Sequence, residues 1–209
     1  MNQRFDTPAS PTDVAIFQDP PHEPIPVLRA WFDTAKAGGV LEPGAMALAT
    51  TGAKGHASTR MVQVLDIGPD GLLFTTHAGS QKGREIAALG WASGVLYWRE
   101  TKQQIVVSGP IAPISIEASD ALWAKRSPVT YPMSSVSLQS ETLDDEQALR
   151  AKAQRLIDAG LPFPRPVGWL GYALRPTIIE FWQASPDQLH NRLRYDATAD
   201  GWTIRRLQP

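Results

Sequence analysis

The stretch 71–109 constrains the fold more than any other part of the chain. Residues 72–76 have the short apolar pattern of a strand, and 80–90 have helical spacing between a serine and a glycine. Residues 94–108 then read as two strands joined by a tight polar turn. The order strand, capped helix and hairpin predicts a chain built mostly of β-strands with added helices.

The start of the predicted helix has the features of an anion site. Ser80 is the N-cap candidate, and Lys82 and Arg84 lie in the first turn. Free backbone N–H groups and the positive end of the helix dipole favour a phosphate there, and the two side chains add full charges. Most capped helices of this kind bind only water, so the local pattern permits a phosphate site without identifying one.

Further short strands and turns extend the pattern on both sides. Their spacing, with glycine-rich turns between them, is typical of an antiparallel meander or barrel. The additional strands are expected at 45–51, 58–65, 105–114, 168–174, 177–182, 192–195 and 202–207. Helices are expected at 27–39, 115–126 and 142–160, the last with a capping box formed by Thr142 and Asp145, and a hydroxyl-rich loop is expected at 129–140.

The predicted domain organisation is simple. Residues 1–26 contain six prolines and little periodicity, so we predict a mobile or draped arm there. Residues 27–209 are long enough for one hydrophobic core and are predicted to form a single domain.

Composition excludes several classes of protein. The 209 residues include no cysteine, which rules out disulfides, thiolate catalysis and a cysteinyl flavin link. A net charge of -1 and a pI near 6.4 argue against nucleic acid or an acidic membrane as the main partner. With neither a long apolar run nor a secretory signal, the sequence predicts a cytoplasmic protein.

Neither metal nor hydrolase chemistry is supported by the spacing of polar residues. His22, His56, His77 and His190 share no ligand spacing, so no metal site is predicted, and His77 is interpreted as a turn residue. There is no G-x-S-x-G motif to place a nucleophilic serine.

A series of short motifs over residues 45–209 resembles the pyridoxamine-phosphate oxidase family of FMN split-barrel flavoproteins. The motifs are Arg60-Met61-Val62, Phe74-Thr75-Thr76, Gly79-Ser80-Gln81-Lys82, Gln104, Gln139-Ser140, Glu180-Phe181-Trp182 and Arg205-Arg206-Leu207-Gln208-Pro209. Within the family the likeness is strongest to the flavin oxidases of phenazine biosynthesis, in 76–85, 91–101 and 132–137. The resemblance implies a mostly β, α+β fold: an FMN-binding split β-barrel that forms a homodimer with FMN at the interface.

The same resemblance implies a set of residues for non-covalent FMN. FMN fits better than FAD, because there is one basic turn and no G-x-G-x-x-G in a βαβ unit. The loop with Gln139 and Ser140 is expected to reach the flavin bound mainly by the other subunit. The full set is Arg60, Met61, Val62, Thr75, Thr76, Gln81, Lys82, Gln104, Gln139, Ser140, Trp182 and Arg192. Thr75 replaces an aromatic residue of the family pattern and Gln81 a basic one.

Departures from the vitamin-oxidizing members indicate a different substrate. Where those enzymes have lysine, tyrosine and arginine around the substrate, this sequence has Leu65, Leu122 and Gln188. The implied substrate set is Leu65, Leu122, Arg126, Thr130, Gln188 and His190, with His190 and Arg192 as catalytic candidates. Two leucines beside an arginine suit a flat, apolar acid such as a reduced tricyclic phenazine carboxylate.

The resulting expectation is an FMN-dependent oxidase that removes hydride from a partly reduced phenazine carboxylate, with O2 reoxidizing the flavin and forming H2O2. Two alternatives stay open. One is a pyridoxamine or pyridoxine 5′-phosphate oxidase. The other is a flavin-binding protein without catalytic activity.

Overall fold

The computed structural model describes residues 15–160 and 162–209. Ten strands in these residues form an antiparallel sheet that curls on itself, with β10-β9-β8-β6-β5-β1-β2 in order and β7, β4 and β3 continuing from β6. The strands are β1 (Ala45–Thr51), β2 (Ala57–Gln63), β3 (Asp66–Gly68), β4 (Gly71–His77), β5 (Trp91–Trp98), β6 (Gln103–Pro113), β7 (Trp169–Leu174), β8 (Ile178–Gln183), β9 (Asn191–Thr198) and β10 (Gly201–Arg206). The predicted class, mostly β with peripheral helices, is confirmed.

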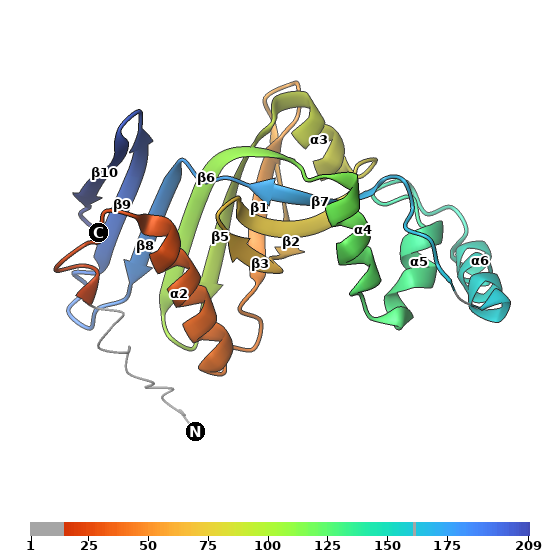
Figure 1. The fold of residues 1–209 in the computed structure, drawn as a ribbon, viewed down its shortest axis with the longest axis horizontal. Helices are drawn as coiled ribbons and strands as arrows, with labels where there is room; N and C mark the ends of the chain where they lie inside the picture. The colour runs from red at the N-terminus through yellow and green to blue at the C-terminus, as the bar shows by residue number, and fades with distance from the viewer. Residues whose placement is uncertain (1–14, 161) are drawn as a thin grey trace.

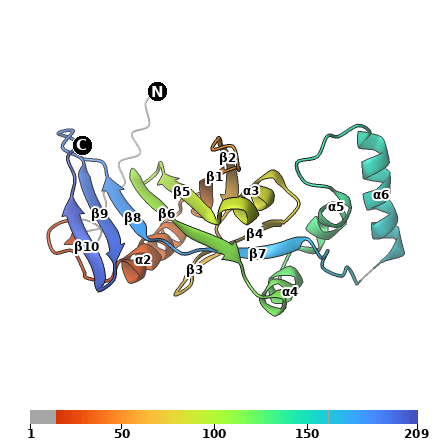
Figure 2. The ribbon, with the colours of Figure 1, turned by 90° about the horizontal axis from the view of Figure 1, so that it is seen from above.

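The helices lie around this sheet. Figures 1 and 2 show α4, α5 and α6 together at one end of the molecule and β8, β9 and β10 at the other. The helices are α2 (Pro24–Ala37), α3 (Gln81–Leu89), α4 (Ile116–Ala124), the 3-10 turn η1 (Pro128–Thr130), α5 (Tyr131–Val136) and α6 (Glu146–Ala159).

The sheet has an inner face that forms the core and an outer face that is partly exposed. Leu48 of β1, Val107 of β6 and Ile179 of β8 are almost completely buried on the inner face. Helix α2 covers part of this core with Trp31, whose ring centroid lies 5.1 Å from that of Phe181 in an edge-to-face contact. Because side chains alternate along a strand, the residues between these positions point to the outer face.

The chain around the start of α2 differs from the prediction in where the helix begins. Helix α2 begins at Pro24, because proline suits the first helical turn, where its missing N–H has no helical partner. Phe17 is 3% exposed, and its ring centroid lies 6.1 Å from that of Trp31. Residues 15–26 therefore pack on the domain, as the draped form of the predicted arm would, although α2 begins before the expected boundary at residue 26. Residues 1–14 lie outside the described part.

The predicted loop at 129–140 is also wrong over most of its length. It contains most of η1 and all of α5, with prolines in their first turns. Tyr131 anchors α5, since its hydroxyl donates to the backbone oxygen of Trp123 at 2.9 Å. The next helix, α6, begins later than expected, because Asp145 caps it by accepting from the backbone N–H of Ala148 at 2.8 Å. Thr142 is not its cap.

No helix among residues 15–160 and 162–209 is long and apolar enough to span a membrane.

Candidate functional site

The start of α3 has the predicted cap. The hydroxyl of Ser80 accepts the backbone N–H of Gly83 at 3.2 Å, and Gly90 ends the helix with a φ of 60°. A Cβ at Gly83 would lie within about 2.5 Å of two backbone oxygens of the preceding turn, so only glycine fits there. The strand β4 is thus held tightly against the first turn of α3.

Lys82 is a buried cation at this turn. It is 8% exposed, and its Nζ donates to the neutral oxygens of Thr76 and Gln139, each at 3.3 Å. Among the described residues, no carboxylate lies within ion-pair distance of this Nζ. Burial lowers the pKa of Lys82, neighbouring Arg60 lowers it further, and Glu85 acts in the opposite direction. The charge of Lys82 therefore has no direct counter-anion in the chain described.

Arg60 lies on the inner face of β2 and is surrounded by acceptors. Its Nη1 donates to Thr50 Oγ1 at 2.5 Å and to the backbone oxygen of Leu48 at 3.3 Å. Its Nη2 donates to Ser58 Oγ at 2.5 Å and to Glu85 Oε2 at 3.1 Å. The side chain of Arg60 is 20% exposed and that of Glu85 is 11% exposed, so this ion pair is largely sheltered from water.

Glu85 collects further donors around the same position. Thr50 and Ser58 donate to its Oε2 at 2.5 and 2.6 Å, and Gln81 Nε2 donates to its Oε1 at 3.0 Å. Burial alone would raise the pKa of Glu85, but the hydrogen bonds from Ser58, Thr50, Gln81 and Arg60 outweigh it and lower the pKa to about 2. Glu85 is thus ionised at every pH at which the protein would normally work.

The lowered pKa of Glu85 predicts that the folded protein loses stability in acid. The folded carboxylate has a pKa below its usual value of 4.5, so its stabilising contribution is complete above pH 4.5 and is lost as pH falls toward 2. We expect the melting temperature of the wild type to fall more between pH 4.5 and 2.5 than that of Glu85→Gln. Calorimetry of both proteins over this range tests it, and parallel curves would contradict the assignment.

A second group of predicted residues lies on the outer face. Gln104 of β6, Trp182 of β8 and Arg192 of β9 are neighbours in the strand register. Arg192 donates from Nε to Glu180 Oε1 at 2.8 Å, and its Nη2 lies 2.7 Å from the same oxygen. His190 packs on Trp182, with ring centroids 5.0 Å apart, and its Nδ1 accepts a backbone N–H from the loop at 3.1 Å.

The two groups face opposite sides of one sheet. Arg60 is opposite Leu48, and the register continues through Val107 to Ile179, all on the inner face. Gln104, Trp182 and Arg192 occupy outer-face positions. Four strand spacings of about 4.8 Å separate β2 from β8, or about 19 Å along the sheet. A single chain therefore does not bring its two groups around one small molecule.

Gln139 belongs with Lys82 of its own chain. Its Oε1 accepts the Thr76 hydroxyl at 2.9 Å as well as Lys82 Nζ. The Gln139–Ser140 loop therefore stands beside the start of α3 of its own chain. The expectation that it serves mainly the flavin of the other subunit stays a prediction.

The predicted substrate residues lie in different parts of the structure. Arg126 donates from Nε to Thr130 Oγ1 at 3.2 Å, and from Nη2 to Ser134 Oγ at 2.9 Å. Its guanidinium carbon lies 5.3 Å from the ring centroid of Trp123 and 5.0 Å from that of Trp169. Leu122, on the preceding turn, packs on the bare backbone of Gly171. The remaining three are placed elsewhere: Leu65 is 43% exposed between β2 and β3, and Gln188 and His190 lie in the loop that follows β8.

The other predicted cofactor residues are spread over both faces. Val62 is on the inner face, whereas Met61 is 61% exposed on the outer face. Thr75 points to the other side of β4 from Thr76. Ser140 is exposed and has a φ of 75°, an uncommon conformation for serine.

Three polar residues of the site were not identified from sequence. Glu85 and Glu180 are the carboxylates that hold Arg60 and Arg192, and Ser134 holds Arg126. Glu85 and Arg60 are far apart in the sequence, which hides the first pair. Glu180 and Arg192 are only diagonal neighbours, because the β8–β9 register pairs Glu180 with Arg194 and Arg192 with Trp182.

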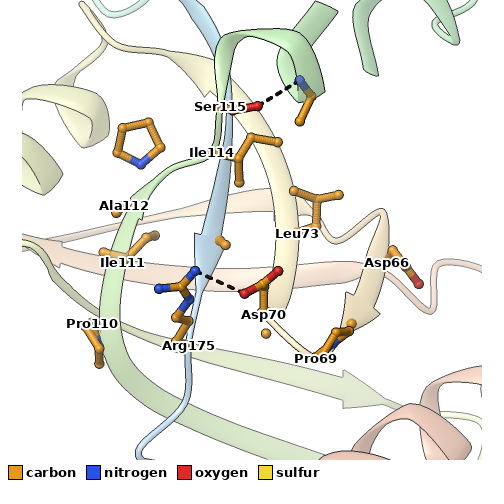
Figure 3. Close-up of a pocket in the computed structure, with 15 residues that line it drawn as sticks. Asp66, Pro69, Asp70, Leu73, Pro110, Ile111, Ala112, Ile114, Ser115 and Arg175 are labelled. Carbon is orange, nitrogen blue, oxygen red and sulfur yellow. Dashed lines mark hydrogen bonds and ion pairs between the residues drawn. The ribbon is translucent and has the colours of Figure 1, made fainter. Parts of the chain in front are cut away.

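A cavity of about 670 Å³ lies apart from these residues (Figure 3). It is lined by the start of β4, the end of β6 and part of β7, with Ile111 and Leu73 among its apolar walls. Arg175 at its edge is paired with Asp70 at 3.1 Å. None of the predicted site residues lines this cavity, so its size alone does not make it the site of chemistry. The described residues also include no cluster of His, Asp and Glu suited to a metal ion.

Two family models match the chain. One, described as pyridoxamine 5′-phosphate oxidase, matches residues 33–159. The other, described as the pyridoxine 5′-phosphate oxidase C-terminal dimerisation region, matches residues 169–209. The chain belongs to the pyridoxamine 5′-phosphate oxidase family. The dimerisation model covers β7 to β10, which includes Trp182 and Arg192 of the outer-face group.

Individual members of the family are also similar over nearly the whole chain. Dihydrophenazinedicarboxylate synthase of Pseudomonas chlororaphis is 49% identical, covering 92% of this chain and 87% of its own. The protein of that name from Burkholderia lata is 46% identical, covering 99% and 98%. The crystal structure of PhzG from Burkholderia lata 383 in complex with tetrahydrophenazine-1-carboxylic acid matches with 47% identity and a TM-score of 0.90, covering 93% and 96%. This match confirms the predicted split barrel.

Proposed function

We propose that this protein is an FMN-dependent oxidase of phenazine biosynthesis that oxidizes a partly reduced phenazine carboxylate. The observation that carries the proposal is the buried, unpaired ammonium of Lys82 at the capped start of α3, beside Arg60. A phosphate monoester supplies the anion that this arrangement lacks. The names of the relatives that are 46–49% identical support the phenazine pathway.

The residues present fit FMN. Lys82, the first backbone N–H groups of α3 and the Gln139 amide would hold one phosphate. When bound, FMN supplies the redox chemistry: it accepts a hydride from the substrate, and O2 then takes the electrons to give H2O2. The protein's part is to bind and orient the two rings and to exclude other reactions.

A second copy of the chain would complete each site. Gln104, Trp182 and Arg192 face away from Arg60 of their own chain, so they would contact the flavin of a partner. The outer face is suited to such a contact, since Met61 is 61% and Tyr97 is 55% exposed beside small alanines of β1. Matching of residues 169–209 to a dimerisation region supports the homodimer.

The substrate side of the site suits a flat aromatic acid. Arg126 would take a carboxylate, since two of its nitrogens are already fixed by Thr130 and Ser134 and its face is covered by tryptophans. Leu65 and Leu122 would offer apolar contact to the rings. Arg192, held by Glu180, would act next to the flavin, and His190 beside Trp182 would assist movement of the proton released with the hydride.

The first alternative, a pyridoxamine or pyridoxine 5′-phosphate oxidase, has the family fold in its favour. Leu65, Leu122 and Gln188 argue against it, because they cannot provide the lysine, tyrosine and arginine contacts of such enzymes. The second alternative, a non-catalytic flavin-binding protein, would bind FMN without any substrate-dependent change in the flavin.

The test is to purify the protein and to add candidate substrates without oxygen. We expect a yellow homodimer with one removable FMN per chain, whose absorbance bleaches with a reduced phenazine carboxylate and returns, with H2O2, when air is admitted. A protein that stays colourless with added FMN would refute FMN binding. Bound FMN that no dihydroaromatic acid bleaches would favour the non-catalytic alternative.

A further inference from the structure

Glu85 is a nearly buried carboxylate with no part in the proposed reaction. It lies on the second turn of α3 and accepts hydrogen bonds from side chains of β1, β2 and α3 itself. It is also the only acidic partner that the structure gives to Arg60 among the described residues. Such a position beside a proposed phosphate site requires an explanation, because a carboxylate repels a phosphate.

The hydrogen bonds of Arg60 show what Glu85 does. The four N–H bonds of Nη1 and Nη2 are matched by four acceptors: Leu48, Thr50, Ser58 and Glu85. Three of these contacts form one network, because Thr50 and Ser58 donate onward to Glu85. As placed, Arg60 has only its Nε–H left for an anion, so it is not a free two-donor clamp.

The charges give the second part of the argument. Arg60 and Lys82 together provide two positive charges, and Glu85 reduces this to a net charge of about one. Lys82 is left as the unpaired cation, while Arg60 is both neutralised and held in place. The anion site is therefore weaker for any phosphate than its two cations alone would make it.

We propose that Glu85 is a positioning residue that holds Arg60 and limits the affinity of the α3 site for phosphate groups. The inference rests on the proposed function, since it takes FMN as the ligand. With Glu85 present, charge alone binds phosphate weakly, and tight binding needs the additional ring contacts that FMN makes and inorganic phosphate lacks.

The decisive variant is Glu85→Gln, which removes the charge and keeps the shape. The amide oxygen can accept from Thr50, Ser58 and Arg60, and the new NH2 can donate to Gln81 once the Gln81 amide turns over. We expect apoprotein of this variant to bind FMN about tenfold more tightly than the wild type in fluorescence titrations. The inhibition constant of inorganic phosphate, from competition titrations analysed with the FMN affinity of each protein, should also fall about tenfold.

Glu85→Asp is the second variant. It keeps the charge but is one methylene shorter, so it loosens Arg60 without removing the repulsion, and we expect FMN binding about threefold tighter than the wild type. Glu117→Gln, on the exposed first turn of α4, is the matched control and should bind FMN as the wild type does.

The order Glu85→Gln, Glu85→Asp, wild type in falling affinity supports the proposal. A residue that only stabilised the fold would instead give weaker FMN binding in both variants, which would overturn it, as would unchanged affinity. If the melting curve shows that Glu85→Gln does not fold, Glu85→Asp alone is the test. Tighter FMN binding by that variant would support the proposal, and unchanged or weaker binding would overturn it. Failure of the wild type to bind FMN is a different result, because it would refute the proposed function itself.

Discussion

Pyridoxamine 5′-phosphate is expected to be turned over at least about a thousandfold less efficiently, in kcat/KM, than a reduced phenazine carboxylate. The family resemblance implies that Leu65, Leu122 and Gln188 take the place of polar side chains that bind the substrate in the vitamin oxidases. If each missing bond to a charged group is worth about 1.5 to 3 kcal/mol, three of them amount to roughly 4 to 9 kcal/mol. Arg126 is still present and would supply part of the lost binding free energy, so the lower end of this range applies. At about 1.4 kcal/mol per factor of ten, that lower end is about a thousandfold.

The matching gain-of-function variant is Leu65→Lys, Leu122→Tyr, Gln188→Arg. Gln188 already has a φ of 67°, and arginine is no more branched at Cβ than glutamine, so the backbone should tolerate the change. Leu143→Lys, at an exposed leucine elsewhere, is the control for an added positive charge. Steady-state rates with both substrates are the measurement. Equal wild-type efficiency on the two substrates would refute the phenazine assignment, and a triple variant without any gain would show that other residues set the specificity.

Lys82→Met is expected to weaken FMN binding by about 1.5 to 3 kcal/mol, or roughly tenfold to more than a hundredfold. Methionine keeps most of the buried stem and removes the charge. In the apoprotein that charge is buried, has no direct anionic partner and is disfavoured by Arg60. We therefore expect the apoprotein of the variant to melt at the same temperature as the wild type or higher, while its affinity for FMN falls.

Titration calorimetry and melting curves of the apoprotein separate these two effects. Lys152→Met, at an exposed lysine of α6, is the control and should change neither quantity. Unchanged FMN affinity in Lys82→Met would show that the phosphate binds elsewhere. A large loss of apoprotein stability would show that Lys82 has a structural role that its contacts do not reveal.

The sequence was informative wherever a local signal determines structure. Helix α3 has its predicted start and end, because the Ser80 cap and the left-handed Gly90 are formed by residues within one turn. The β5–β6 hairpin was also predicted correctly, because a short turn between two neighbouring strands is a local signal. The helix at 131–136 was missed because its one proline, Pro132, and the surrounding hydroxyls favour a loop, although proline is compatible with a first turn.

The site was less accessible to sequence reasoning, because its contacts join distant residues. Glu85 meets Thr50 and Ser58, which are 35 and 27 residues earlier in the chain. Gln139 meets Thr76 and Lys82 across 63 and 57 residues. The family resemblance supplied Gln139, but only the packing of the loop beside α3 shows its contacts with Thr76 and Lys82.

The placement of Arg60 and Trp182 on opposite faces of one sheet has a thermodynamic consequence under the proposed function. A ligand that touches two copies at once binds the dimer better than the separate chains. By linkage, FMN must then strengthen association of the two chains by the same factor by which association strengthens FMN binding. Loss of cofactor and dissociation of subunits would therefore be coupled, and dilution of the protein would favour both.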